Sequence, residues 1–70
     1  MTRSAIANNG ELIKRKIEEL DKTQEDFAEE IGIGDRGIRK WLKNGVYDIR
    51  TLLRLAKAFD CSVEDLICYE

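Results

Sequence analysis

Glycines divide the middle of this 70-residue sequence into short blocks, and their spacing limits the elements that the chain can form. Gly32, Gly34 and Gly37 lie close together, and Gly45 follows after one further block. Glycine adopts the left-handed conformation without steric cost, so a glycine directly after an amphipathic segment commonly ends a helix. The spacing predicts two short helices joined by a tight turn at residues 32–34, the second ending at residues 44–45.

Apolar residues in the rest of the chain recur at intervals of three and four, the spacing of one helix face. In the first such block Leu12, Ile13 and Ile17 share a face, and in the last long block the apolar stripe includes Ile49 and Leu53. This spacing predicts helices at residues 9–20, 24–31, 35–43, 49–59 and 63–67. No segment alternates with period two for long enough to form a strand. The expected fold class is all-α, with five short helices.

Side-chain oxygens stand where three of these helices would begin. Thr23 is expected to accept a hydrogen bond from the amide of Asp26, and Asp48 to cap the helix at 49–59. Ser62 and Asp65 have the spacing of a capping box. These caps support the predicted helix boundaries.

The length of the chain sets its domain organisation. Seventy residues form one hydrophobic core, so we expect an N-terminal arm at residues 1–8 and a single domain at residues 9–70. No apolar run approaches the roughly 18 residues of a membrane-spanning helix, and no secretory leader precedes the domain. These features predict a cytoplasmic protein with no membrane partner.

Side chains that carry chemistry are scarce. The sequence has no His, and Cys61 and Cys68 are too widely spaced for a zinc site, so we expect no metal, no cofactor and no catalytic residue. Gly32, Gly34 and Gly37 match G-x-G-x-x-G, but dinucleotide binding also needs a preceding buried strand and a βαβ unit. The residues before Gly32, EDFAEEI, are polar and helical. The match is accidental, and an enzyme is not expected.

Positive charge is concentrated in the middle third of the chain, although the whole sequence has a net charge of −2. Residues 34–57 carry seven basic and two acidic side chains, net +5, whereas residues 1–33 are net −3 and residues 58–70 are net −4. Salt screens charges beyond about 8–10 Å, so the local excess decides which partner approaches. Residues 34–57 are therefore the expected site for an anionic partner.

Two consecutive segments carry a family resemblance. The stretch TQEDFAEEIGIGDRGIRKWLKNG, followed by DIRTLLRLAKAFDCSVEDLI, resembles the phage repressor/Cro-type (XRE) helix-turn-helix family. The resemblance covers residues 12–67 and places the helix-turn-helix at residues 24–43. It implies a lambda-repressor-like domain that binds double-stranded DNA sequence-specifically. It also implies a transcriptional regulator, commonly a repressor that acts as a homodimer on a palindromic operator.

The resemblance further implies roles for individual residues. The first turn of the second helix of the motif faces the DNA bases, which assigns base contacts to Asp35, Arg36 and Lys40. Arg36 is the best candidate, because a guanidinium can donate two hydrogen bonds to guanine. The residues expected to contact DNA phosphates are Thr23, Gln24, Gly37, Arg39, Lys43 and Asn44.

Several positions have a local alternative. Asp35 can instead stabilise the start of its helix or hydrogen-bond Gln24, and Lys40 can reach either a base or a phosphate. Gly37 either lets DNA approach the backbone closely or is merely tolerated in the helix. Trp41 is assigned to the core rather than to base stacking. The charged residues expected on a solvated face of the 49–59 helix are Arg50, Arg54 and Lys57.

A homodimer is expected to use the end of the chain. Leu66, Ile67 and Tyr69 are the predicted dimerisation residues, because they offer more apolar surface than a short tail needs. A two-fold dimer would place its recognition helices about 34 Å apart, one turn of DNA.

An alternative function on the same fold is a protein-binding module, such as an antitoxin with a toxin-like protein partner. That module would use the acidic helix at 24–31 or the C-terminal tail, and its DNA binding would be secondary. The acidic residues of this helix are Glu25, Asp26, Glu29 and Glu30. Their repulsion is expected to weaken non-specific DNA binding.

Overall fold

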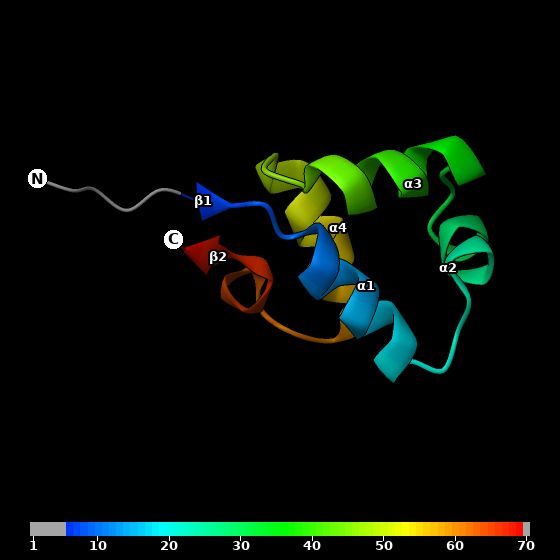
Figure 1. The fold of residues 1–70 in the computed structure, drawn as a ribbon. Coiled ribbons are helices and arrows are strands. Elements are labelled where there is room, and N and C mark those ends of the chain that lie inside the picture. Colours follow the sequence, from blue (N-terminus) through cyan, green and yellow to red (C-terminus); the bar gives the residue numbers. More distant parts are fainter. Residues whose placement is uncertain (1–5, 70) are drawn as a thin grey trace, which may run out of the picture.

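The computed structural model describes residues 6–69, which form four α-helices, one 3₁₀ helix and a pair of two-residue strands (Figure 1). The elements are β1 (Ile6–Ala7), α1 (Gly10–Glu19), α2 (Gln24–Glu30), α3 (Asp35–Asn44), α4 (Ile49–Phe59), η1 (Val63–Leu66) and β2 (Cys68–Tyr69). In Figure 1, α3 runs along the top of the molecule with α2 below its beginning, and β1 and β2 lie together on the opposite side. The helical character of the chain is as predicted.

The predicted helix ends agree with the structure within one residue, but the fifth predicted helix is a 3₁₀ helix of four residues. Its backbone bonds span three residues, from the amide of Asp65 to the carbonyl of Ser62 and from Ile67 to Glu64. The segment is too short to complete α-helical bonds after its cap. The predicted capping box is present, and the Ser62 amide donates to the Asp65 carboxylate at 3.2 Å.

The expectation that the chain forms no strand is wrong for its two ends. Ile6–Ala7 pairs antiparallel with Cys68–Tyr69, in the register Ile6 to Tyr69 and Ala7 to Cys68. Strands of two residues are too short to produce an alternating pattern in the sequence. Part of the predicted N-terminal arm is therefore paired, and the rest of it, residues 1–5, lies outside the described residues.

The predicted helix caps are confirmed. The Thr23 hydroxyl accepts from the Asp26 amide at 3.1 Å, and the Asp48 carboxylate accepts from the Thr51 amide at 3.0 Å. Gly45 ends α3, because its φ of +84° lies outside the helical region. Glycine adopts such a positive φ more easily than other residues do.

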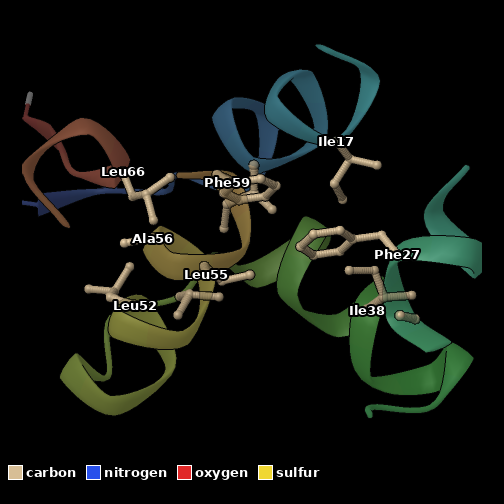
Figure 2. Close-up of a cluster of buried hydrophobic side chains, with 11 residues drawn as sticks. Ile17, Phe27, Ile38, Leu52, Leu55, Ala56, Phe59 and Leu66 are labelled. Atoms are coloured by element: carbon tan, nitrogen blue, oxygen red, sulfur yellow. The ribbon is translucent and has the colours of Figure 1, made fainter. Parts of the chain in front are cut away.

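The core lies between the four helices (Figure 2). The rings of Phe27 from α2 and Phe59 from α4 stack with centroids 4.9 Å apart. The fully or nearly buried apolar residues are Ile13, Ile17, Phe27, Ala28, Ile38, Val46, Leu52, Leu55, Ala56, Phe59 and Leu66. The predicted stripe of α4 is too wide, because Ile49 and Leu53 are 59% and 55% exposed.

Two residues at the start of α1 fix its position in the fold, one through hydrogen bonds and the other through close packing on α3. Asn9 is buried, and its amide group joins the segments that contain Val46 and Leu66. Gly10 packs directly on the last turns of α3: a Cβ on Gly10 would lie 2.1 Å from the carbonyl oxygen of Leu42. No side chain fits at this position, so α1 packs on α3 through direct backbone contact.

Candidate nucleic-acid interface

The turn between α2 and α3 is held by backbone bonds and by one side chain from α4. Gly32 takes a φ of +77°, and the amide of Ile33 donates to the carbonyl of Ala28 at 2.9 Å. The Arg54 guanidinium donates to the carbonyl of Ile31, the first residue after α2. Sequence analysis assigned Arg54 only to a solvated face. Its bond joins positions 23 residues apart, and no local pattern indicates it.

Helix α3 has one face on the core and one face in solvent. Ile38 is buried, and Trp41 and Leu42 are half-buried against the core, as predicted for Trp41. The exposed residues of α3 are Asp35, Arg36, Arg39, Lys40, Lys43 and Asn44. Four of these six side chains are cationic, so the solvent face of α3 is a basic surface.

The three residues assigned to base contacts are all exposed, but they differ in their contacts. Asp35 forms an ion pair with Arg39, with 2.8 Å between carboxylate and guanidinium. Asp35 therefore bonds along its own helix, and within the described residues its carboxylate accepts no hydrogen bond from Gln24. Among residues 6–69, neither Arg36 nor Lys40 forms an ion pair. Arg36 lies in the first turn of α3, and Lys40 lies one turn later, near the middle of the helix.

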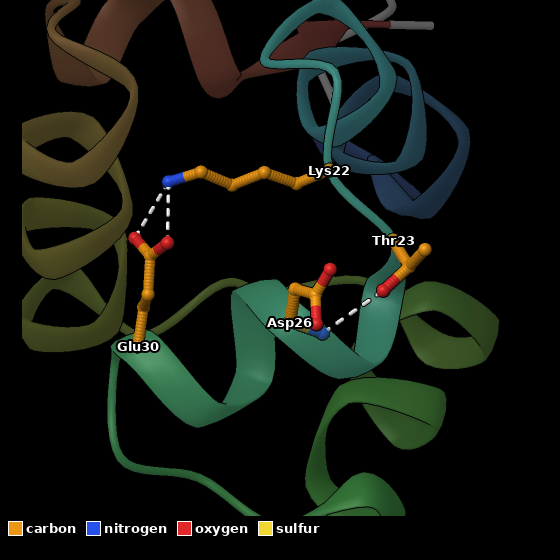
Figure 3. A network of polar contacts seen from close by, with 4 residues as sticks. All are labelled: Lys22, Thr23, Asp26 and Glu30. Carbon is orange, nitrogen blue, oxygen red and sulfur yellow. Dashed lines mark hydrogen bonds and ion pairs between the residues drawn. The ribbon is translucent and has the colours of Figure 1, made fainter.

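Four of the six residues assigned to phosphate contacts lie at the two ends of the helix pair, whereas Gly37 and Arg39 lie between these ends in α3. The Thr23 hydroxyl caps α2, as Figure 3 shows, and half-buried Gln24 follows it. At the other end, Lys43 and Asn44 have exposed side chains, and the Lys43 carbonyl accepts from Asn8 Nδ2 at 2.9 Å. The structure thus places Thr23 and Gln24 at the start of α2, and Lys43 and Asn44 at the end of α3.

Gly37 has room for a side chain. A Cβ on Gly37 would lie 3.5 Å from the Cβ of Ile33, which is an ordinary van der Waals distance. The fold itself therefore does not require glycine at this position of α3.

Helix α2 carries four acidic residues and no basic one. Glu25, Asp26 and Glu29 are exposed. Glu30 instead forms an ion pair with Lys22, at 2.6 Å (Figure 3). The two helices of the motif thus carry exposed side chains of opposite charge.

The predicted dimerisation residues do not form one exposed surface. Leu66 is wrong as a dimerisation residue, because its side chain is 0% exposed in the core of its own chain. Ile67 is half-buried, and Tyr69 lies in β2 with its backbone opposite Ile6. The apolar spacing of the tail reflects packing within the chain at Leu66.

Within residues 6–69, two groups have a shifted pKa. The backbone hydrogen bond from Thr51 lowers the pKa of Asp48 from 3.8, because it stabilises the carboxylate form. Burial raises the pKa of the Cys61 thiol from 9.0. Neither group lies on the exposed face of α3.

A family model described as helix-turn-helix matches residues 13–66, most of the chain, including all of α2 and α3. The chain belongs to the phage repressor/Cro-type (XRE) helix-turn-helix family. Members of this family are DNA-binding transcription regulators. No curated protein and no solved structure matched the chain. In the part of the chain that the structure describes, each helix is too short or too polar to span a bilayer.

Proposed function

We propose that this helix-turn-helix protein is a transcriptional repressor that binds a palindromic operator as a homodimer, with α3 in the major groove. The observation that carries the proposal is the exposed basic face of α3. An α-helix fits the roughly 12 Å width of the major groove, and cations on its outer face approach base edges and phosphates together. Repression would follow from occupancy, since a bound dimer covers DNA that the polymerase needs.

Arg36 and Lys40 have the best geometry for reading bases. Both are exposed, and neither is held by an ion pair among the described residues. Arg36 lies in the first turn of α3, where a guanidinium can donate to N7 and O6 of a guanine. Lys40 follows one turn later and reaches the next base or the adjacent phosphate.

Arg39 and Asp35 would separate from each other when DNA binds, rather than contact the bases. Their ion pair is on the surface, with side chains 73% and 49% exposed, and such pairs contribute little to stability. A phosphate can therefore replace Asp35 as the partner of Arg39 at small cost. The DNA backbone would be held at the two ends of the motif, by Thr23 and Gln24 at the start of α2 and by Lys43 and Asn44 at the end of α3.

The test is selection of binding sites from a random duplex DNA pool, followed by affinity measurements on the selected site. We expect a palindromic sequence with half-sites one helical turn apart. Arg36→Ala should reduce affinity about 5- to 150-fold, the equivalent of about 1–3 kcal/mol, and relax the preference at one base pair. Arg15→Ala, at an exposed position of α1, is the matched control and should leave affinity unchanged.

The proposal fails if no sequence is enriched, or if Arg36→Ala and Arg15→Ala have equal effects while both remain folded by circular dichroism.

The acidic face of α2 supports a second candidate function, a protein-binding module of the antitoxin type. Glu25, Asp26 and Glu29 are exposed and form no ion pair within residues 6–69, so they can attract a basic protein. Co-purification of a basic partner that is lost in Glu25→Gln/Glu29→Gln, together with weak DNA binding, would favour this candidate.

A further inference from the structure

The turn between α2 and α3 has little packing on its own backbone. A Cβ added to Gly32 or to Gly34 would meet no atom within 4 Å, so no neighbouring element covers these two residues on the side where a side chain would lie. Ile33, between them, packs against the core, and its amide donates to the Ala28 carbonyl at 2.9 Å. The shape of the turn therefore depends on a few hydrogen bonds.

One side chain from outside the helix-turn-helix bonds to this turn. The Arg54 guanidinium donates to the carbonyl of Ile31, and within residues 6–69 no other side chain forms a hydrogen bond with residues 31–34. Carbonyl groups at the end of a helix have no partner within the helix. The Ile31 carbonyl belongs to the peptide group that leads into Gly32, whose φ is +77°. The bond from Arg54 therefore restrains the peptide plane at which the chain leaves α2.

This bond gives α4 a second point of attachment to α2. The first is the stack of Phe59 on Phe27, with ring centroids 4.9 Å apart. Phe27 and Ile31 are four residues apart, so the two points are about 6 Å apart along α2. Contact at one point would let α2 and its turn rotate relative to α4, whereas contact at two points fixes the angle between them.

We propose that Arg54 is a positioning residue for base recognition: it holds the Ile31 carbonyl, and through the turn it fixes the placement of Arg36 in the major groove. This inference rests on the proposed function, in which Arg36 reads a base. Arg36 lies in the first turn of α3, five residues after Ile31. Two hydrogen bonds to one guanine require the guanidinium to be held within about 0.5 Å, so a looser turn lowers base discrimination.

A positioning role differs from a direct phosphate contact by Arg54 in what it changes. A phosphate contact contributes to the binding of every DNA sequence and adds to the dependence on salt. A positioning residue changes the preference between sequences, and leaves non-specific binding and its salt dependence unchanged.

Lys57 provides a matched control on the same helix. Arg54 and Lys57 are both exposed, and together with Ile31 and Ala58 they line one shallow recess. Within residues 6–69 Lys57 forms no ion pair, and Arg54 alone bonds to the turn. Arg54→Met and Lys57→Met each remove one positive charge and leave an unbranched apolar side chain. A difference between the two variants therefore reports on the bond to Ile31.

Binding of the full 70-residue chain to two duplexes tests the role in recognition. One duplex is the selected operator, and in the other the base pair at which Arg36→Ala relaxes the preference is replaced. We expect Arg54→Met to reduce the ratio of the two affinities at least about threefold, as for coupled residues, and Lys57→Met to leave it unchanged. In the Arg36→Ala background, Arg54→Met should not change the ratio further. Affinity for a random duplex, and its salt dependence, should be equal for Arg54→Met and Lys57→Met.

Amide hydrogen exchange, measured by NMR without DNA, tests the turn itself. We expect the Ile33 amide to exchange at least about threefold faster in Arg54→Met than in Lys57→Met, because local opening of the turn becomes easier. The amide of Leu55, whose side chain is buried in the core, should exchange at the same rate in both variants. Equal exchange at Leu55 would show that the two variants have the same global stability.

The proposal is overturned if Ile33 exchanges equally in the two variants. It is also overturned if Arg54→Met weakens binding to all duplexes alike and lowers the salt dependence, which would identify a phosphate contact.

The two proposals fail separately. If the wild type prefers one DNA sequence, but Arg54→Met and Lys57→Met discriminate equally between the duplexes, only the role of Arg54 is wrong. If the wild type enriches no sequence, the repressor function is wrong and Arg54 has no base recognition to support. Exchange at Ile33 then shows whether Arg54 still holds the turn.

Discussion

At the scale of single residues, Asn9 connects three segments of this small domain through one buried side chain. It is 1% exposed, and its side-chain amide donates to the carbonyls of Val46 and Leu66 at 3.0 and 2.6 Å. The side-chain oxygen Oδ1 of Asn9 accepts from the Val46 amide at 2.7 Å. One side chain thus connects the start of α1 with the loop before α4 and with η1.

We predict that Asn9→Ala lowers the free energy of unfolding by about 2–4 kcal/mol. Three hydrogen bonds at about 0.5–1.5 kcal/mol each are lost, and backbone groups in a buried region remain unpaired. Asn8→Ala is the matched control, because Asn8 is exposed and water can replace its bonds to Lys43 and Gly10. We expect a loss below about 1 kcal/mol for the control. Urea unfolding measures both, and equal losses would contradict the role of Asn9.

The sequence could not predict this role. An Asn before the first helical residue is expected to cap its helix with its side chain, yet Asn9 makes no such bond. Its partners lie 37 and 57 positions away in the chain. Gly10 is similar, since its contact with Leu42 depends on how α1 packs on α3. Local patterns contain no information on such distant contacts.

At the scale of elements, the helices were predictable because their signals are local. Apolar spacing located α1 to α4, and the caps at Thr23 and Asp48 are formed by residues three positions apart. The end of α4 at Phe59 was predicted correctly, although its cap is unusual: Asp60 takes the left-handed conformation with a φ of +56°, where glycine or asparagine is more common. The strands at the two ends of the chain were missed because only tertiary pairing creates them.

Asp48 makes the stability of α4 dependent on pH. The hydrogen bond from Thr51 lowers the pKa of Asp48 in the folded state below 3.8. Its contribution is therefore fully present above 3.8 and is lost as the pH falls through the lower, folded-state pKa. Asp48→Asn keeps a capping oxygen but has no charge to titrate. We predict that the wild type has the higher Tm at neutral pH and that the difference shrinks in strong acid.

Thermal unfolding of both proteins across this pH range checks the prediction. Other carboxylates titrate in both proteins, so only the difference in Tm reports on Asp48. A difference that stays constant down to the lowest pH would show that the ionised form of Asp48 is not what stabilises the helix.

At the scale of the whole molecule, the sequence located the candidate site but not all of its contacts. The period of α3 predicted which side chains reach solvent, and Asp35, Arg36 and Lys40 are all exposed. The pairing of Asp35 with Arg39 was not predicted, because an i,i+4 pair is one of several arrangements open to two exposed side chains. The prediction that Leu66 is a dimerisation residue was wrong for a different reason. Apolar spacing is the same for a core residue and for an interface residue.

The distribution of charge over the molecule leads to a prediction on salt. Cations of α3 face solvent, and α2 of the same motif carries exposed carboxylates, so DNA affinity should depend on phosphate contacts and be opposed by repulsion. We predict that the logarithm of the association constant falls linearly with the logarithm of the salt concentration, by about 0.9 per phosphate contacted. Lys43→Gln should reduce this slope by about one, while Lys14→Gln on α1 should leave it unchanged.

Fluorescence anisotropy with the selected operator at increasing salt concentration measures both slopes. The comparison separates the two candidate functions, because Lys43 and Lys14 carry equal charge and only Lys43 lies at the end of α3. A flat response, or equal slopes for the two variants, would mean that the basic face of α3 does not contact phosphates. The acidic face of α2 would then be the stronger candidate site, and its partner would be a basic protein rather than DNA.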